Sequence, residues 1–214
     1  MGNFLLKNGQ TILFIGDSIT DCGRRDSAFP YGDGYVRLFR EIALARNPKL
    51  DFHVINTGIG GHKVDDLKAR WHDDVMRHDF DVLSVKIGIN DIHRQLGDPA
   101  GAFSVQQYAD DYDGILSQAA TKKSKLILID PFYISTDRSG TFRTTVLDLL
   151  AEYLKVVKSM AKKYNALHLQ THAMFQKLLS QYDPDAFCPE PVHPHHTGHL
   201  AIALEVYKVM GGAL

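Results

Sequence analysis

Five short apolar runs rich in β-branched residues recur along the chain, and polar or glycine-rich residues follow each of them. The runs are ILFI (12–15), FHVIN (52–56), VLSVKI (82–87), KLILID (125–130) and ALHLQ (166–170). Apolar runs of this length, bounded by turn residues, are typical of strands that are buried on both faces. The hydrophobic pattern therefore predicts five strands.

Segments of helical periodicity lie between these runs. Apolar residues spaced three or four apart predict helices around 35–44, 64–75 and 147–157, and a further helix is expected after residue 196. Clusters of Gly, Pro, Ser and Asp predict loops over 24–34, 96–101, 135–140 and 182–196. Strands that alternate with helices form βαβ units. We expect a three-layer α/β/α, flavodoxin-like fold with a central five-stranded parallel sheet.

Composition narrows the picture to one globular domain, residues 1–214. The 214 residues are 44% hydrophobic, which is enough for one sizeable core, and no composition break divides them. Lys and Arg number 24 against 25 Asp and Glu, without long runs of one sign. We therefore expect no nucleic-acid or membrane partner, but a small or neutral molecule. The chain shows no secretory signal or membrane span, and free thiols at Cys22 and Cys188 fit a cytoplasmic protein.

Polar turns follow the first three predicted strands. Gly-Asp-Ser (16–18) follows the first, Asn-Thr-Gly-Ile-Gly-Gly (56–61) the second, and Gly-Ile-Asn-Asp (88–91) the third. In an open parallel sheet, ligands bind beyond the carboxyl ends of the strands. The three turns are therefore expected to meet at one binding rim.

Ser18 is a candidate nucleophile on this rim. Taken alone, Ser18 is better explained as the N-cap of a helix. A serine hydroxyl becomes nucleophilic beside a base, and His193 lies in a proline-rich loop that can cover the rim. Glu190 precedes this histidine by three residues and can fix its tautomer, as the third member of a catalytic triad does. The backbone N–H groups of Ser18 and Gly61 and the side-chain amide of Asn90 can form an oxyanion hole.

The blocks GDSIT, NTGIGG, GIND and EPVHP, in this order, resemble the four blocks of the SGNH, or GDSL, hydrolases. This resemblance implies that Ser18 is the nucleophile, that Ser18, Gly61 and Asn90 form the oxyanion hole, and that His193 is the base. The stretches GDSITDCGR, DLKARWHDDV, GINDIHRQ, DPFYI and VHPHHTGHLAIA further resemble intracellular bacterial acetylxylan esterases. Such enzymes remove acetyl groups from xylo-oligosaccharides or similar sugar esters through an acyl-enzyme, need no cofactor, and are plausible homo-oligomers.

One position departs from the family pattern. The family usually has Asp three residues before the histidine, where this chain has Glu190. Glutamate carries the same charge on a side chain that is one methylene longer, so we expect it to orient His193. Asp183 and Asp185 remain alternative carboxylates for this role. Asp17 is expected to support the turn at the nucleophile and not to react.

Two other functions compete with an esterase. A metal-dependent phosphoesterase could use the histidine cluster His193, His195, His196 and His199, but the HExxH, CxxC and Gly-Asn-His-Asp signatures are missing, so no metal is expected. A non-catalytic flavodoxin-like binding module would need phosphate-binding donors after the first strand, where Asp17 and Asp21 would repel phosphate. Lys86, within a strand, is expected in a buried ion pair or at an exposed strand end.

Aromatic residues in the predicted rim loops are candidates to stack on a sugar, although aromatic residues in loops equally often serve packing. These candidate substrate-binding residues are Phe29, Tyr31, Tyr133 and Phe187.

Overall fold

The five predicted strands pair side by side in one parallel sheet. The computed structural model describes residues 4–98 and 103–213. The strands are β1 (Gln10–Gly16), β2 (Phe52–Asn56), β3 (Val82–Lys86), β4 (Lys125–Ile129) and β5 (Leu167–Leu169). Their order in the sheet is β2-β1-β3-β4-β5, and every neighbouring pair is parallel. The chain thus builds outward in both directions from β1, and the crevice where ligands bind in such sheets opens beyond β1 and β3.

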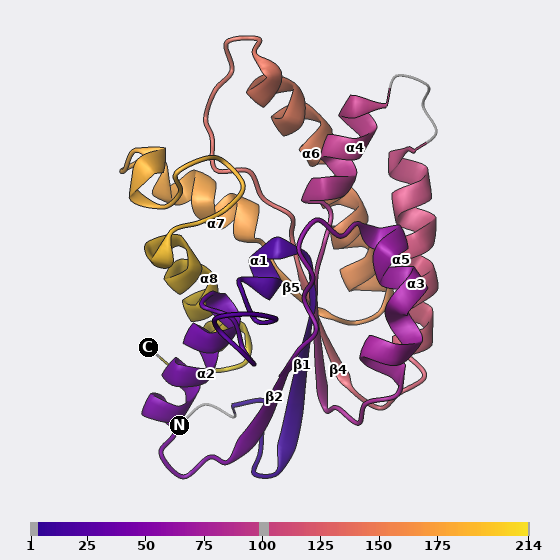
Figure 1. Ribbon diagram of the computed structural model, residues 1–214, viewed down its shortest axis with the longest axis vertical. Coiled ribbons are helices and arrows are strands. Elements are labelled where there is room, and N and C mark those ends of the chain that lie inside the picture. Colours follow the sequence, from indigo (N-terminus) through magenta and orange to yellow (C-terminus); the bar gives the residue numbers. More distant parts are fainter. Residues whose placement is uncertain (1–3, 99–102, 214) are drawn as a thin grey trace.

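Helices cover both faces of the sheet, as Figure 1 shows. On one face, α2 (Tyr35–Arg46) packs against α8 (His196–Val209), and α7 (Thr171–Leu178) lies on the same side. On the other face, α3 (Val64–Trp71) packs against α5 (Val105–Ala119), which in turn contacts α6 (Phe142–Lys163). This arrangement confirms the predicted three-layer, flavodoxin-like fold.

The sheet is the centre of the hydrophobic core. Ile12, Leu13, Phe14 and Ile15 on β1 have no exposed surface, because helices cover side chains on both faces of the strand. The helices contribute large buried rings to the same core, among them Phe39, Trp71, Tyr108 and Tyr153. This packing explains why the strands read as continuous apolar runs and not as alternating patterns.

Two short elements begin directly at the carboxyl ends of central strands. Helix α1 (Ser18–Asp21) follows β1, and α4 (Ile89–Gly97) follows β3. Helices α4, α5 and α7 were not predicted from periodicity. In α4, Ile89, Ile92 and Leu96 do recur at helical spacing, but the helix has only nine residues, and its first residues were interpreted as the polar turn Gly-Ile-Asn-Asp.

The predicted boundaries need three further corrections. The helix expected over 64–75 changes after Trp71 from α-helical to π-helical hydrogen bonding, in η1 (His72–Met76). The loop expected over 182–196 contains a short 3₁₀ helix, η2 (Pro184–Ala186), and ends before His196, which opens α8. Of the loop expected over 96–101, Leu96 and Gly97 belong to α4, whereas 99–101 lie outside the described residues.

Among residues 4–98 and 103–213, no helix combines the length and the apolar character that a membrane span requires. Cys22 and Cys188 are both free thiols, as predicted.

Candidate active site

A tight turn delivers Ser18 from the end of β1 to the first position of α1. Asp17 is the N-cap of this helix, and its Oδ1 accepts a hydrogen bond of 3.1 Å from the Ile19 N–H. Gly16 must be glycine, because a Cβ there would lie 2.4 Å from both the Lys86 carbonyl oxygen and Thr20 Oγ1. The sequence Gly-Asp-Ser therefore combines a close strand contact, a helix cap and an emerging hydroxyl.

A buried ion pair between Asp17 of this turn and Lys86 of β3 holds the turn in place. Lys86 Nζ lies 3.0 Å from Asp17 Oδ2, and the two side chains are 1% and 0% exposed. The ammonium group also lies 4.9 Å from the centre of the Phe132 ring. Burial lowers the pKa of Lys86, and the Asp17 carboxylate opposes this shift. Of the two alternatives for Lys86, the buried ion pair is confirmed, and it ties the nucleophile's turn to β3.

Ser18, His193 and Glu190 form a continuous chain of hydrogen bonds. Ser18 Oγ lies 2.9 Å from His193 Nε2, and His193 Nδ1 lies 2.6 Å from Glu190 Oε1. Because a carboxylate only accepts hydrogen bonds, Nδ1 carries the proton and Nε2 is free to accept the serine proton. The histidine and glutamate side chains are 59% and 47% exposed, so this arrangement is open to a substrate.

Glu190 is held by the loop that it helps to shape. Its carboxylate accepts backbone hydrogen bonds from Val192, at 2.9 Å, and from His193, at 2.7 Å. Partial burial by itself would raise the pKa of Glu190. The hydrogen bonds from the backbone and from the His193 ring have a larger combined effect, so the pKa is lowered overall. Among the described residues, neither Asp183 nor Asp185 forms a hydrogen bond with His193; Asp183 instead caps η2. The longer glutamate side chain thus reaches the ring directly.

Three hydrogen-bond donors near Ser18 lack a protein acceptor in the described part of the chain. They are the Ser18 N–H at the start of α1, the Gly61 N–H, and the second N–H of the Asn90 amide. The first amide N–H of Asn90 donates to the His62 carbonyl oxygen at 3.0 Å, which fixes the side chain next to Gly61. Gly60 lies against the nucleophile, since a Cβ on it would be 3.7 Å from Ser18 Cβ.

Arg70, which sequence reasoning missed, joins the segments that carry these donors. From α3 its guanidinium donates to the Gly16 carbonyl oxygen at 3.1 Å, the Thr57 carbonyl oxygen at 2.6 Å and His62 Nδ1 at 3.0 Å. It also forms an ion pair with Asp74. Nothing in the local pattern of α3 distinguishes this arginine from a solvated one. Its role follows only from the packing of α3 against the ends of β1 and β2.

Asn56 and Asp21 support the same turns. The buried Asn56 amide donates to the Thr20 carbonyl oxygen at 2.7 Å, and its Oδ1 accepts the Gly58 N–H at 2.9 Å. Asp21 Oδ2 accepts the Gly60 N–H at 3.0 Å. These bonds bring the glycine-rich turn after β2 against α1.

The histidines considered as metal ligands have separate surroundings. His199 is buried: its Nδ1 accepts the Tyr35 N–H at 3.2 Å, and its Nε2 lies 3.6 Å from Cys22 Sγ. Burial lowers the pKa of His199 to about 4, so its imidazole is neutral. His195 caps α8 and His196 opens it. Within the described ranges, no three or more His, Cys, Asp or Glu side chains are grouped as metal ligands would be.

The four candidate sugar-stacking residues differ in their surroundings. Phe29 is 78% exposed, whereas Tyr31 lies under the Arg40 guanidinium, 5.0 Å from its ring centre. Phe187 is 6% exposed and packs between the rings of Phe175 and Tyr182.

Tyr133 is 5% exposed and packs against His93. The backbone of its neighbour Ile134 donates to the Pro191 carbonyl oxygen at 2.8 Å. Of the four candidates, two are therefore tied by hydrogen bonds to the loop of His193: Tyr133 through its neighbour Ile134, and Phe187 through its own carbonyl oxygen, which accepts the His195 N–H at 2.7 Å.

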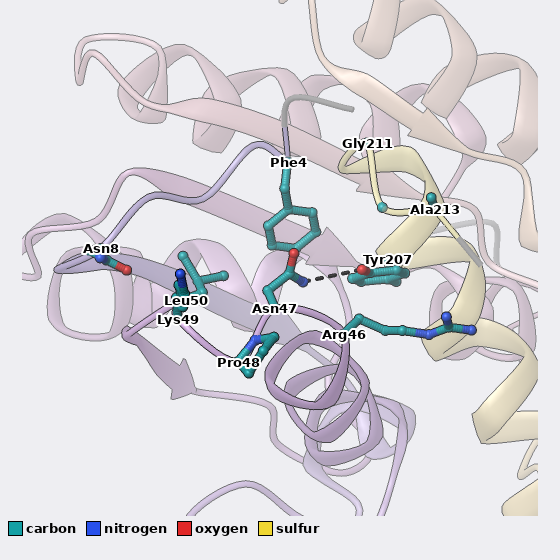
Figure 2. A pocket seen from close by; sticks show the side chains of 11 residues that line it. Phe4, Asn8, Arg46, Asn47, Pro48, Lys49, Leu50, Tyr207, Gly211 and Ala213 are labelled. Carbon is teal, nitrogen blue, oxygen red and sulfur yellow. Dashed lines mark hydrogen bonds between the residues drawn. The ribbon is translucent and has the colours of Figure 1, made fainter. Parts of the chain in front are cut away.

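A cavity of about 630 Å³ lies elsewhere, where the carboxyl ends of α2 and α8 meet. Figure 2 shows Phe4, Leu50 and Tyr207 around it, and the Asn47 amide donates to the Tyr207 hydroxyl at 3.2 Å. It contains none of the three residues Ser18, Glu190 and His193. Because the chemistry requires these groups, we assign this cavity no part in the reaction.

Comparison with known proteins places this geometry in context. Residues 14–201 match the family model described as the GDSL-like lipase/acylhydrolase family. The chain is 37% identical to an acetylxylan esterase of Geobacillus stearothermophilus over 95% of both chains. The crystal structure of Axe2, an acetylxylan esterase from Geobacillus stearothermophilus, covers 98% of this chain and 97% of its own, with a TM-score of 0.88 and 34% identity.

Further structural matches include another hydrolase and several variants of Axe2. LAE5, an α/β hydrolase enzyme from the metagenome of Lake Arreo, has a TM-score of 0.87 and 27% identity, over 97% of this chain and 98% of its own. Several of the matched structures are catalytic mutants of Axe2, in which a serine, an aspartate or a histidine is replaced by alanine.

Proposed function

The chain belongs to the GDSL-like lipase/acylhydrolase family, and from this we propose that it is a serine esterase that removes acetyl groups from xylo-oligosaccharides or related sugar esters. The observation that carries the proposal is the hydrogen-bonded chain Ser18–His193–Glu190 beside three unpaired donors. The acetylxylan esterase relatives support the substrate class.

The geometry supports a two-step acyl transfer. His193 Nε2 accepts the hydroxyl proton while Ser18 Oγ attacks the ester carbonyl carbon. The N–H groups of Ser18 and Gly61 and the Asn90 amide bind the oxyanion that forms. The imidazolium then gives its proton to the departing sugar oxygen, which leaves an acetyl-serine. In the second step, His193 activates a water molecule that attacks this ester, and acetate is released.

Glu190 serves both steps in this mechanism. Its negative charge keeps the proton on Nδ1 of His193 before the reaction and stabilises the imidazolium during it. A catalytic aspartate in Axe2 supports a carboxylate in this role, and the 2.6 Å contact supports Glu190 as its counterpart.

The proposal extends to the whole protein. Residues 1–214 form a single hydrolase domain, for which the family match over 14–201 is the support. Two free thiols fit a cytoplasmic protein, and we expect a homo-oligomer, which light scattering on the purified protein would test. The esterase needs no cofactor.

The decisive experiment compares acyl groups and sugars. Acetyl, butyryl and octanoyl 4-nitrophenyl esters are assayed alongside acetylated xylo-oligosaccharides, with Ser18→Ala as the control for the nucleophile. We expect acetyl esters to be preferred, acetate to be released from the oligosaccharides, and folded Ser18→Ala to lose nearly all turnover. Preference for octanoyl esters, or turnover by the variant, would contradict the proposal.

The competing metal-dependent phosphoesterase has its own test. Prolonged treatment with EDTA or phenanthroline should leave the esterase rate unchanged, because no step of the serine mechanism uses a metal. A rate that is lost to the chelator and restored by one metal ion would favour the histidine cluster instead.

A further inference from the structure

Three aromatic side chains meet near the catalytic loop, and two of them lie outside the residues expected to bind substrate. Phe142 is the first residue of α6, His93 lies in α4, and Tyr133 follows β4. The His93 ring centre lies 6.2 Å from that of Phe142 and 6.3 Å from that of Tyr133, with the tyrosine ring at 84° to the imidazole. Figure 1 shows α4 beside α6, and the two helices are in contact. We refer to these three residues as the aromatic group.

The Phe142 ring is unusually open to solvent. It is 61% exposed, and among the large apolar side chains of the described residues only Phe29 and Tyr182 are comparably exposed. Unlike an isolated surface residue, Phe142 contacts the His93 ring, which in turn contacts the nearly buried Tyr133. Exposed aromatic surface that is continuous with a site is typical of ligand contacts.

The polar atoms of the aromatic group lack partners. The His93 side chain forms no hydrogen bond with any described residue; its Nε2 is shielded from solvent, which is costly for a polar atom, whereas its Nδ1 reaches solvent. Burial lowers the pKa of His93, so its ring is a neutral imidazole that can both donate and accept. The Tyr133 hydroxyl likewise has no partner in the described part of the chain, although its atoms reach solvent.

Two connections place the aromatic group at the reacting centre. His93 lies one helical turn after Asn90, so both side chains project from the same side of α4. The charge of Glu190 influences the pKa of both His93 and Tyr133, and that of His193 also acts on His93. Together with the bond from Ile134 to Pro191, this places the aromatic group beside the loop that carries Glu190 and His193.

We propose that Phe142, His93 and Tyr133 form the subsite for the sugar part of the ester, with the apolar face of a pyranose ring on Phe142 and its hydroxyls bonded to the Tyr133 hydroxyl and to His93 Nδ1. This inference rests on the proposed function and adds where the sugar binds. A pyranose presents C–H groups on its faces and hydroxyls at its edge. An exposed ring flanked by unpaired polar atoms matches both features.

Two measurements test the subsite separately from the esterase function. The first is the ratio of kcat/KM for acetylated xylo-oligosaccharides to that for 4-nitrophenyl acetate. The second is inhibition of 4-nitrophenyl acetate hydrolysis by xylotetraose, which carries no ester. The variants are Phe142→Ala, His93→Phe, which keeps a ring but removes the nitrogens, and the control Tyr182→Ala, an aromatic residue of similar exposure (59%).

We expect Phe142→Ala to lower the substrate ratio and raise the inhibition constant by roughly fivefold to tenfold, as the loss of one aromatic contact implies. His93→Phe should change both in the same direction, whereas Tyr182→Ala should match wild type. Equal effects of Phe142→Ala and Tyr182→Ala, or no inhibition of wild type by xylotetraose, would overturn the subsite. Failure of wild type to release acetate from the oligosaccharides would instead overturn the proposed substrate class.

Discussion

At the scale of single residues, the site depends on a carboxylate that differs from the family pattern. Glu190 accepts three hydrogen bonds, two from the backbone and one from His193. The negative charge of Glu190 and its backbone hydrogen bonds have different roles. The charge stabilises the imidazolium, whereas any good acceptor could hold the loop.

Replacing Glu190 by Gln separates these roles. The single amide oxygen of Glu190→Gln can still accept the bonds from the His193 N–H and ring, whereas its amino group faces the Val192 N–H and cannot accept that bond. The side chain also carries no charge, so we expect kcat to fall by ~10²- to 10⁴-fold with only a modest loss of thermal stability. Glu190→Asp keeps the charge on a shorter side chain and should lose about tenfold or less, as steady-state kinetics on 4-nitrophenyl acetate would show. A near wild-type Glu190→Gln together with an inactive Asp185→Asn would move the role to Asp185.

Asn90 offers a second test at this scale. Its unpaired amide N–H is assigned to the oxyanion, which exists only in the transition state and the intermediate. Asn90→Ala should therefore lower kcat by ~10²-fold or more and leave KM nearly unchanged. If KM rises and kcat is preserved, the side chain has a structural role through its bond to the His62 carbonyl oxygen.

At the scale of secondary-structure elements, α3 holds the active-site turns together. Its arginine, Arg70, donates to backbone or side-chain acceptors that follow β1 and β2. Two of the three proposed oxyanion donors, the N–H groups of Ser18 and Gly61, lie on these same turns, which makes Arg70 a positioning residue. It touches no reacting atom.

Arg70→Lys tests this assignment because lysine keeps the charge but loses the planar fork of donors. We expect kcat to fall about tenfold or more with a smaller change in KM, since displaced donors weaken oxyanion binding. Arg37→Lys is the matched control, because Arg37 also has more than one hydrogen-bond acceptor, the carboxylates of Asp33 and Glu41, but on the exposed surface of α2. Equal kinetics for the two variants, with a lower Tm for Arg70→Lys alone, would reduce Arg70 to a structural role.

At the scale of the whole molecule, Asp91 links folding stability to pH. It is fully buried; its Oδ1 accepts the Val64 N–H at 2.9 Å, which ties α3 to α4, and its Oδ2 has no partner among the described residues. Burial raises the pKa of Asp91 to about 7. In an unfolded chain, an aspartate has a pKa of about 3.9. The folded state therefore holds this proton more tightly than the unfolded state.

The sign of the effect follows from this difference. The contribution of Asp91 to stability is complete below about pH 4 and is lost as the pH rises to about 7, because ionisation is then cheaper in the unfolded chain. Asp91→Asn keeps the acceptor for Val64 and cannot ionise. Its Tm should therefore fall less than that of wild type between these pH values, whereas the exposed control Asp110→Asn should follow wild type. If the plots of Tm against pH for wild type and Asp91→Asn run parallel, the raised pKa of Asp91 is contradicted.

The sequence determined the strands and the layered fold, and it predicted the order of the groups that we propose to react. Apolar runs must be buried on both faces, and a parallel sheet brings their carboxyl ends to one edge, so Ser18, Gly61 and Asn90 could be placed from local patterns. His193 and Glu190 could be proposed as their partners because the family blocks occur in order. Helix α4 escaped prediction because it is short and its first residues were interpreted as a turn, although Ile89, Ile92 and Leu96 are spaced as on one helix face.

Only the tertiary structure decided which distant side chains meet. Arg70 bonds the Gly16 carbonyl oxygen across 54 residues of sequence, and Phe142, His93 and Tyr133 come together from three separate elements. The local sequence around each of these residues does not reveal whether its side chain faces solvent or contacts another element. Hydrogen bonds and ring contacts between elements depend on how the helices pack on the sheet. The apolar periodicity of a helix indicates only that one of its faces is buried, and not which residues of other elements that helix contacts.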